Sequence, residues 1–381
     1  MNLQELCSKK LRRFVKHSAP TEKSSLDHMV WKRFKRNKLA MISLVVIGLF
    51  AVMAILGYLI TPDHTPYCNQ QYLELATMKP FSKAEFVYVI DENRPAKKQG
   101  WFKKMLFGEP MPYNAIPIYS HQEIGDSIRV ETYTGGVPND GEIKQFAKSE
   151  VAKIGTRRFV LGTDGYGRDV LSQIMIGSRV SLSVGFIAVF IALIIGITLG
   201  ALAAYYGGWV DNVIMWLINV VWSIPTVLLV IAITFALGKG FWQVFVAVGL
   251  TMWVDVARVV RGQVFSIKEK EYVEATRALG YSTFRTIFKH ILPNIVGAVI
   301  VITASNFASA ILLEAGLSFL GIGVQPPMPS WGSMVKENYG YILLDSAYLA
   351  FLPGLAIMLI VLAFMLLGNG LRDAMDIKDN V

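Results

Sequence analysis

Five stretches of this sequence are long, strongly apolar and free of Asp, Glu, Lys and Arg. Each contains at least 22 residues, and a helix needs about 20 apolar residues to cross the hydrocarbon core of a bilayer. The first is also too long for the apolar region of a signal peptide, so we expect it to stay as an anchor. The sequence therefore predicts a polytopic membrane protein. The five stretches are 39–60, 180–210, 212–238, 290–313 and 346–371.

The composition supports this prediction. Only 17% of the residues are charged and 53% are hydrophobic, whereas soluble domains carry about 25% charged residues. These values exclude a disordered chain, a coiled coil and a disulfide-stapled mini-protein. Cys7 and Cys68 are the only cysteines, which rules out a cysteine-rich metal cluster. We expect no disulfide between them, because the span at 39–60 separates the two residues.

A sixth span has to include charged residues. The uncharged stretch after Lys239 has only 15 residues, and extending it to Val260 takes in Asp255 and Arg258. Both charges would then lie near the cytoplasmic end of the helix, where they can reach the interface or face a neighbouring helix. The alternative is a re-entrant or buried helix.

Positive charge indicates which parts of the chain face the cytoplasm. Residues 1–38 hold eleven Lys and Arg against three acids, and residues 257–290 hold seven against three. A basic segment can bind nucleic acid, but the first one ends directly against an apolar span, which favours a cytoplasmic flank beside anionic lipid. An even number of spans must separate two cytoplasmic segments. We therefore predict six transmembrane helices with both termini cytoplasmic, and no nucleic-acid partner.

The predicted fold class is an all-α polytopic membrane protein with a small α+β extracytoplasmic insert. About 100 residues between the first and second spans are long enough for such a subdomain. The predicted divisions are a basic cytoplasmic segment at 1–38, a first transmembrane helix at 39–60, the insert at 61–160, and a transmembrane domain at 161–376 with a cytoplasmic loop at 264–293.

Within the insert, two segments predict strands, 86–90 by composition and 128–133 by alternation. A polar cap and a periodic apolar face predict a helix over 141–154, with Gly155 as its stop. The segment 97–104 mixes cations with aromatic residues. It either lies at the lipid headgroups, touches a partner, or is a plain solvated face.

Sequence motifs of catalysis are missing. The chain has no G-x-x-x-x-G-K-[ST] loop for ATP, no G-x-S-x-G and no H-E-x-x-H, and its five histidines are scattered. We expect no enzyme activity, no metal site and no cofactor bound by this chain. The predicted spans also lack the paired carboxylates and buried lysines of ion-coupled carriers. The chain is therefore expected to be a conduit that obtains its energy from another protein.

The cytoplasmic loop 264–293 predicts two short helices. A capping box at 266–269 predicts the start of the first helix, and Gly280 supplies a left-handed stop. Ser282 predicts the cap of the second helix, which would end before Pro293. Two short basic helices joined at a glycine either project as a knob that a partner can grip, or lie on the membrane as an ordinary amphipathic loop.

Part of this loop resembles the Glu-Ala-Ala loop of ABC importer permeases. The resemblance is carried by Glu274-Ala275-Thr276, Gly280 and Leu292-Pro293. Thr276 replaces an alanine of the pattern and His290 an isoleucine, and a histidine there is familiar in the dipeptide, oligopeptide and nickel branch. The resemblance implies a coupling helix that docks in a cleft of an ATPase subunit. The coupling residues that it implies are Glu274, Ala275, Thr276 and Gly280.

Four further segments are similar to the same branch and stand in the family's order. They are the basic aromatic lead-in 31–38, typical of C-type subunits, the entry to the second span at 161–169, the outer loop 314–332 and the C-terminal end 367–373. Glu314 either faces the mouth of the pathway or forms a salt bridge at a helix end. The resemblance covers residues 31–60 and about 160–376 and says nothing about the insert.

The resemblance implies a permease subunit of a bacterial ABC importer in the inner membrane, forming half of the pathway for peptides or similar small solutes. Its implied partners are a second homologous permease, two ATPase subunits that use ATP, an extracytoplasmic solute-binding protein and membrane lipid. A stand-alone channel or carrier, and a membrane-anchored scaffold or sensor, stay open as alternatives. No substrate-binding or pore-lining residue can be singled out. Pro225 and Pro353 lie within spans and predict kinks there.

Overall fold

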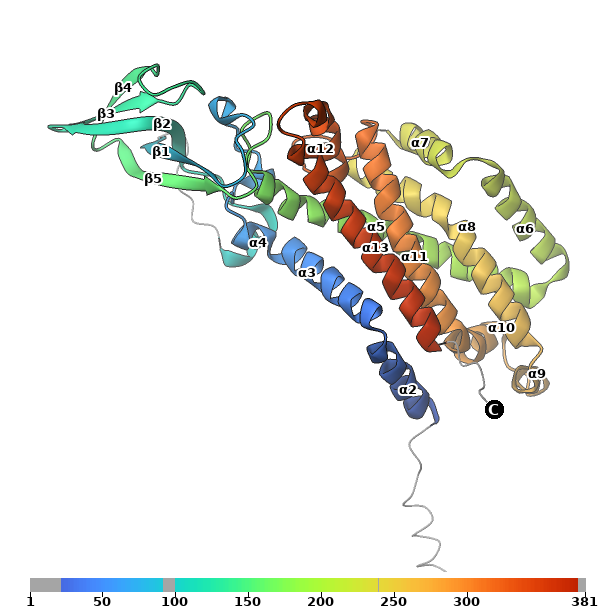
Figure 1. Ribbon diagram of the computed structural model, residues 1–381. Helices are drawn as coiled ribbons and strands as arrows, with labels where there is room; N and C mark the ends of the chain where they lie inside the picture. Colours follow the sequence, from blue (N-terminus) through green and yellow to red (C-terminus); the bar gives the residue numbers. More distant parts are fainter. Residues whose placement is uncertain (1–21, 92–99, 239, 376–381) are drawn as a thin grey trace, which may run out of the picture.

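The computed structural model describes residues 22–91, 100–238 and 240–375. Figure 1 shows a bundle of long helices with a small β-sheet beyond one end, which we call the sheet end. At the opposite end, which we call the loop end, lie helix α2 (Glu22–Arg36), the short helices α9 (Glu271–Ala278) and α10 (Thr283–Thr286), and the last turns of α13 (Tyr348–Met375).

Among the described residues, five helices are long and apolar enough to cross a membrane. They are α3 (Lys38–Ile60), α5 (Val170–Tyr206), α8 (Phe241–Lys268), the helix Thr283–Phe319 that includes α11 (Leu292–Phe319), and α13 (Tyr348–Met375). A sixth candidate is a bent pair, α6 (Gly208–Ser223) and α7 (Thr226–Leu237), whose axes differ by 94°. The prediction of a mostly helical polytopic protein with a small sheet is confirmed.

The bend between α6 and α7 falls at Pro225, one of the two prolines predicted to mark kinks. Proline has no amide hydrogen, and its ring collides with the carbonyl four residues earlier, so a helix cannot run through it without distortion. The preceding Ile224 amide makes only a long 3.4 Å contact to the Val221 carbonyl. Pro353, by contrast, lies inside α13, which continues as one helix.

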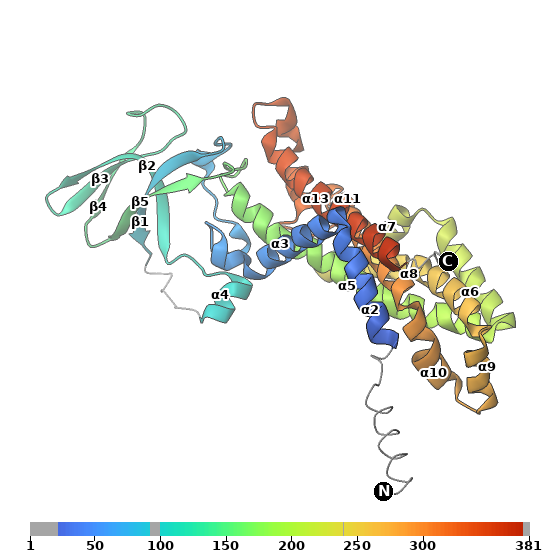
Figure 2. The same ribbon diagram turned by 60° about the horizontal axis from the view of Figure 1, so that its bottom comes forward.

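Helices α5 and α8 pack closely because glycines line their contact. A Cβ on Gly200 would come 2.4 Å from the Ala257 carbonyl oxygen, and a Cβ on Gly196 would come 2.5 Å from the Cβ of Val256. Lipid tails are as apolar as side chains, so close backbone approach and dispersion hold membrane helices together. On the outside of this core, α3 runs along the bundle and joins α2 at the loop end (Figure 2).

Helix α8 is longer than the sequence predicted. It continues past Val260 to Lys268, because Val260, Val264 and Ile267 remain buried against the bundle. Asp255 and Arg258 therefore lie near the middle of the helix, and their predicted position near its cytoplasmic end is wrong.

The capping box predicted at 266–269 is also wrong. Ser266 lies exposed in the last turn of α8, and the next helix, α9, begins only after Lys270. The buried apolar stripe of α8 outweighs the local capping pattern, since tertiary packing contributes more to helix stability than one capping interaction.

The insert contains a five-stranded antiparallel sheet in the order β4-β3-β2-β1-β5. Its strands are β1 (Ser82–Ile90), β2 (Tyr113–Ile124), β3 (Ser127–Thr132), β4 (Ile143–Ala147) and β5 (Val151–Phe159). The predicted strands at 86–90 and 128–133 fall on β1 and β3 and are confirmed. One face of the sheet buries Phe86 in an aromatic cluster, and the other buries Val87 with Val130.

The helix predicted over 141–154 is wrong. This segment forms β4 and the first part of β5. These strands lie at opposite edges of the sheet, where β4 pairs with β3 and β5 pairs with β1. Gly155, the expected helix stop, lies within β5 opposite Phe86. The apolar residues of the segment fit a helical face as well as two short strands, and only pairing with β1, far away in the chain, decides between them.

Shorter elements join the sheet to the bundle. They are η1 (Pro66–Cys68), η2 (Leu73–Leu75), α4 (Trp101–Phe107), α12 (Trp331–Asn338) and η4 (Tyr339–Leu343). Of the predicted segment 97–104, residues 97–99 lie outside the described residues, as does Cys7, and the rest leads into α4 with Trp101 and Phe102 exposed. Cys68 is a free, buried cysteine.

Candidate functional site

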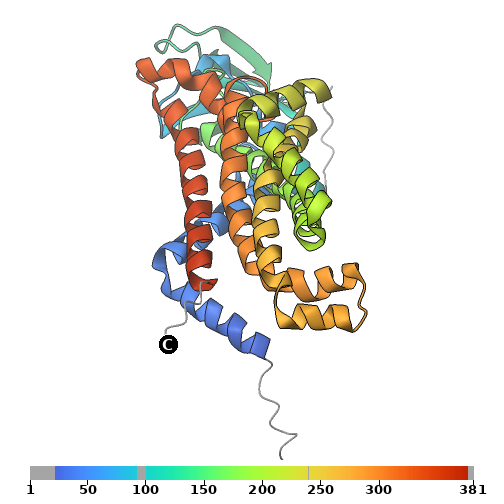
Figure 3. The same ribbon diagram turned by 90° about the vertical axis from the view of Figure 1, so that its right-hand side faces the viewer.

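The loop predicted to couple the chain to an ATPase forms a hairpin of two short helices, α9 and α10, which project side by side from the bundle (Figure 3). Helix α9 ends in a Schellman motif, with the Tyr281 amide donating to the Thr276 carbonyl at 3.0 Å and the Gly280 amide to the Arg277 carbonyl at 2.9 Å. Gly280 has a φ of +73°, which glycine adopts without steric cost. The predicted stop at Gly280 is confirmed.

The second short helix was predicted to end before Pro293, and this prediction is wrong. Ser282 does cap α10 by accepting a hydrogen bond from the Arg285 amide at 3.4 Å. Helix α10 then runs through the π-turn η3 (Ile287–Ile291) directly into α11. Pro293 is tolerated because it lies in the first turn of α11, where an amide hydrogen is not needed by the helix. The hairpin is therefore continuous with a membrane helix.

The predicted coupling residues lie on different faces of the hairpin. Glu274, Ala275 and Gly280 are exposed, whereas Thr276 is buried. The Thr276 hydroxyl donates to the Val273 carbonyl at 2.7 Å, and its oxygen lies 3.4 Å from the Thr286 hydroxyl of α10. The threonine that departs from the family pattern therefore packs between the two short helices, and Glu274 and Ala275 remain available to a partner.

Cationic side chains tie the hairpin to the bundle. The Arg277 guanidinium lies 5.0 Å from the ring centre of Tyr205, near the end of α5, within the range of a cation–π interaction. At the end of α8, the Lys268 ammonium donates to the Ala204 carbonyl at 2.6 Å. The hairpin therefore contacts the end of α5 through Arg277, and the end of α5 is joined to the end of α8 through Lys268.

A further ion pair joins α8 to the bent pair. The Arg261 guanidinium donates two hydrogen bonds of 2.6 Å to the Asp211 carboxylate at the start of α6. Bidentate pairs of this kind are among the strongest polar contacts of proteins. The loop end of the bundle is thus linked across α5, α6 and α8 by charged groups.

At the sheet end, the charged turn at 161–169 has a structural role. The Asp164 carboxylate accepts hydrogen bonds from the Arg168 amide at 2.9 Å and the Arg168 guanidinium at 2.6 Å. The same guanidinium donates to Glu337 of α12 at 2.5 Å. Burial alone would lower the pKa of Arg168, but the carboxylates of Asp164 and Glu337 raise that pKa above its ordinary value. This turn fastens the start of α5 to α12.

Glu314 fits neither of its two predicted roles. Its side chain is fully buried in α11, and its carboxylate accepts hydrogen bonds from the Ser318 hydroxyl at 2.7 Å and the Ser181 hydroxyl at 3.3 Å. Among the described residues no cation pairs with it. Glu314 therefore connects α11 to α5 through hydroxyl groups and does not face an open pathway.

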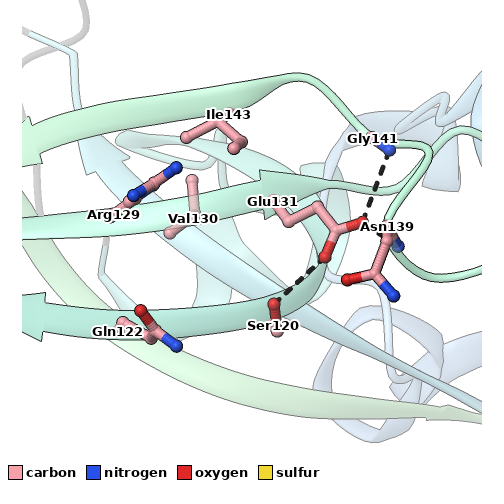
Figure 4. Close-up of a pocket in the computed structure, with 8 residues that line it drawn as sticks. All are labelled: Ser120, Gln122, Arg129, Val130, Glu131, Asn139, Gly141 and Ile143. Atoms are coloured by element: carbon pink, nitrogen blue, oxygen red, sulfur yellow. Dashed lines mark hydrogen bonds between the residues drawn. The ribbon is translucent and has the colours of Figure 1, made fainter.

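Figure 4 shows a pocket on the insert, where Glu131 of β3 points toward Asn139 and Gly141 of the following loop. The Glu131 carboxylate accepts hydrogen bonds from the Asn139 amide at 2.5 Å, the Gly141 amide at 3.4 Å and the Ser120 hydroxyl at 3.2 Å. Its acceptors are already occupied by the chain itself, so this pocket holds a loop against the sheet and is a poor site for a solute.

Two further cavities lie between the membrane helices, along the seam of α8 and α11. One has a volume of about 320 Å³ and includes Asp255, and the other has a volume of about 640 Å³ and lies nearer the loop end. The sequence singled out no pore-lining residue, because spacing along one helix does not tell which faces of different helices meet. These cavities show which faces of α8, α11 and their neighbouring helices meet in the folded bundle.

The comparisons with known proteins agree with this architecture. Residues 196–378 match the family described as binding-protein-dependent transport system inner membrane component. Residues 25–80 match the family described as N-terminal TM domain of oligopeptide transport permease C.

Among the relatives, the glutathione transport system permease protein GsiD of Pectobacterium atrosepticum is 43% identical over 218 residues, which are 57% of this chain and 72% of the relative. The dipeptide transport system permease protein DppC of Bacillus subtilis is 43% identical over 217 residues, 57% of this chain and 68% of the relative. A solved structure of the MetNI methionine ABC transporter in inward-facing conformations covers 54% of this chain and 97% of that chain, with 18% identity and a TM-score of 0.45.

Together with the helical bundle, these matches define the class of this protein as the transmembrane subunit of an ABC importer in the inner membrane. Such subunits are not themselves enzymes. The matches over both parts of the chain narrow the class further. The chain belongs to the binding-protein-dependent transport system inner membrane component family, as a C-type permease of the peptide-transport branch.

Proposed function

We propose that this chain crosses the inner membrane six times, with the bent pair α6–α7 as one span and with both termini and the hairpin in the cytoplasm. The basic segment 1–38 and the basic loop 257–290 support this orientation, because positive loops stay inside. The insert at 61–160 then lies outside, and the membrane domain extends over 161–376. The exterior of α3 and α5 exposes large apolar side chains such as Val52 and Phe186 and is suited to contact with lipid.

We further propose that the coupling loop 264–293 docks on ATPase subunits that bind and hydrolyse ATP, while this chain binds none. The observation that carries the proposal is the hairpin α9–α10, which exposes Glu274 and Ala275 and is fixed to α5, α8 and α11. Closure of the ATPases would move the hairpin and rock the helices between inward-open and outward-open arrangements. A second, homologous permease would complete the pathway, and a solute-binding protein would deliver the solute to the outer side.

The cargo proposed for the pathway is a peptide or a similar small solute. Relatives 43% identical to this chain are a glutathione and a dipeptide transport permease, and both names describe small peptides. The insert, most of which lies outside the two family matches, is proposed to contact the solute-binding protein.

Substitution of Gly280 tests the coupling role. Gly280→Val places a β-branched residue at a φ of +73°, which costs about 1–2 kcal/mol or more and should distort the end of α9. We expect ATP-dependent uptake by the reconstituted complex to fall at least about tenfold, while ATP hydrolysis continues and the chain still inserts. Unchanged uptake would count against the coupling role.

Two matched variants accompany this test. Gly238→Val introduces the same residue at another positive φ, +89°, after the end of α7, where a Cβ also meets open space, and uptake should persist. Gly280→Asn should retain most of the uptake, since asparagine tolerates the left-handed conformation.

The sidedness of the membrane can be measured with cysteines. A cysteine at position 274 should react with an impermeant maleimide only after the cells are opened, whereas a cysteine at position 137, in an exposed loop of the insert, should react in intact cells. Reaction at position 274 in sealed cells would overturn the proposed orientation.

A further inference from the structure

Asp255 and Arg258 are placed where charged side chains are costly. Asp255 lies 14 residues after the start of α8 at Phe241 and 13 before its end at Lys268. At a rise of 1.5 Å per residue this is about 20 Å from either end of the helix. Ionisable residues at such a depth are rare in membrane helices and mark functional sites by default.

Four other charged residues of the membrane helices have structural partners. Arg179 donates to main-chain carbonyls of α3 and α4, Asp211 pairs with Arg261, and Glu314 accepts from serine hydroxyls. In the part of the chain that the structure describes, Asp255 has neither a hydrogen bond nor an ion pair. Its carboxylate is therefore free to accept from a solute.

The carboxylate of Asp255 lines a cavity of about 320 Å³ inside the bend of α6 and α7. Hydroxyl-bearing residues from three helices line the same cavity, Thr226 of α7, Thr251 of α8 and Ser309 of α11. Apolar walls with a few convergent polar groups are the usual make-up of a small-molecule site.

Arg258 lies one turn further along α8, beside the same cavity. Its guanidinium carbon is 3.4 Å from the ring centre of Trp222, which lines the cavity. Its Nε is buried and has no acceptor among the described residues. Residues three apart on a helix have neighbouring side chains, so a carboxylate and a guanidinium without protein hydrogen-bond partners face the same region.

The seam continues from this cavity toward the loop end. The second cavity, of about 640 Å³, is lined by Val259 and Gln263 of α8 and by Ser305 of α11. Positions 251, 255, 259 and 263 are four residues apart, as are 309 and 305, so each set follows one face of its helix. The polar lining therefore leads from the middle of the bundle toward the end that carries the hairpin.

We infer that Asp255 and Arg258 form a subsite on the translocation path for a zwitterionic solute, with Asp255 receiving an ammonium group and Arg258 a carboxylate. The seam of α8 and α11 forms this chain's side of the path, and the second permease closes the other side. The inference rests on the proposed transport function and adds the chemical class that the path accepts.

The test measures the local charge directly and requires no knowledge of the transported solute. Ser309→Cys is introduced into the full complex after both native cysteines, Cys7 and Cys68, are replaced by serine. The modification rates are measured with a cationic reagent, trimethylammonium-ethyl methanethiosulfonate, and an anionic one, sulfonato-ethyl methanethiosulfonate. We expect Asp255→Asn to lower the ratio of the cationic to the anionic rate about three- to ten-fold, and Arg258→Gln to raise it by a similar factor.

Two controls keep the result interpretable. Asp255→Glu retains the charge and should retain the ratio, so a loss caused only by distortion of the helix would be detected. Ser183→Cys, a matched serine beside α3 on the other side of the bundle, should give a ratio that neither charge substitution alters.

The inference is overturned if Ser309→Cys does not react with either reagent, or if its rate ratio is the same with Asp255→Asn and Arg258→Gln. Uptake and ATP hydrolysis are recorded for the same preparations. ATP-driven uptake together with a rate ratio that neither charge substitution alters would contradict the subsite but not the proposed function. A charge-dependent rate ratio without ATP-driven uptake would contradict the proposed function but not the subsite.

Discussion

At the scale of single residues, Arg179 joins three parts of the molecule. From α5, its guanidinium donates to the carbonyls of Ala54 and Ile55 in α3 and to those of Met105 and Leu106 in α4, at 2.5–2.8 Å. Carbonyls near helix ends lack helical partners or share them, and a half-buried guanidinium with its fork of donors can satisfy several at once. We call these contacts the Arg179 clamp. The spacing of residues in the sequence does not predict it, because its acceptors are main-chain atoms.

Replacement of Arg179 by lysine should weaken the clamp. A lysine ammonium has three donors on a flexible stem and cannot reproduce the planar fork. Loss of one to two hydrogen bonds to a charged group costs about 2 kcal/mol, which for a chain of this length corresponds to a fall of about 2–4 °C in the apparent Tm. Thermal unfolding in detergent measures this change. Arg129→Lys, at an exposed position of β3, is the control and should leave Tm unchanged; an equal fall in both variants would contradict the clamp.

Cys68 should be an unreactive thiol. It is fully buried, and its sulfur donates to the Asp63 carbonyl at 3.1 Å. Burial, and secondly the negative charges of Asp63 and Asp169, raise the pKa of the thiol, which lowers the fraction of reactive thiolate at pH 8. Maleimide labelling should be at least about a hundredfold slower than that of a cysteine at position 73, where the native leucine is exposed.

The pH dependence of labelling distinguishes a thiol that stays protonated because it is buried from an exposed thiol that reacts slowly. Between pH 7 and pH 9 the exposed cysteine should label faster as its thiolate forms, because its pKa is near the ordinary value of about 8.5. Labelling of Cys68 should stay low over this range, since its thiol remains protonated. Fast labelling of Cys68 in the folded protein would show that η1 opens readily.

At the scale of elements, the bend of α6 and α7 depends on Pro225. With alanine there, residues 208–237 could form a straight helix, because the amide hydrogen is restored and the ring collision is removed. Spin labels at positions 213 and 235, both exposed, should then separate from about 20 Å in the bent pair to about 33 Å. Pulsed electron–electron resonance measures this distance. Pro353→Ala, within an uninterrupted helix, should leave it unaltered, and a bend that persists in Pro225→Ala would place its cause in tertiary packing.

The elements also show where sequence reasoning succeeds. Uncharged stretches located four of the five long apolar helices, and the bent pair α6–α7, since a bilayer imposes one strong local rule on composition. Gly280 was recognised because a left-handed stop has a local residue requirement. The prediction of a helix at 141–154 failed, because the same apolar residues serve two strands, and the partner of the second strand, β1, is distant in the chain.

The candidate site likewise has a part that the sequence predicted and a part that it did not. Glu274, Ala275, Thr276 and Gly280 were found from a motif that lies within a few residues of the chain. The cavity beside Asp255 was missed because it is made by faces of α7, α8 and α11 that meet only in the folded bundle. Its two charges were visible in the sequence, but their depth depended on where α8 ends, and that end is set by packing of Val264 and Ile267.

At the scale of the whole molecule, the sheet is joined to the bundle through the two segments that flank it in the chain. These segments, residues 72–81 and 160–169, are hydrogen-bonded to each other, and we call them the platform. The chain enters and leaves the sheet at neighbouring points, since Ser82 and Phe159 are paired across β1 and β5. Below them, the Met78 amide donates to the Thr163 hydroxyl at 2.9 Å, and the Tyr348 hydroxyl of α13 donates to the Met78 carbonyl at 2.7 Å. The platform therefore belongs structurally to the bundle.

This arrangement predicts that the sheet can be removed without unfolding the bundle. Paired residues of antiparallel strands are about 4.5–5.5 Å apart, so a Gly-Gly linker can replace residues 82–159. The truncated chain should still insert and co-purify with its partner subunits, although its apparent Tm should fall by several degrees because Arg179 loses the carbonyls of Met105 and Leu106. Uptake should fall while ATP hydrolysis continues, if the insert receives the solute-binding protein. Aggregation of the truncated chain would instead show that the sheet is part of the folding core, because the bundle would then depend on contacts beyond the platform.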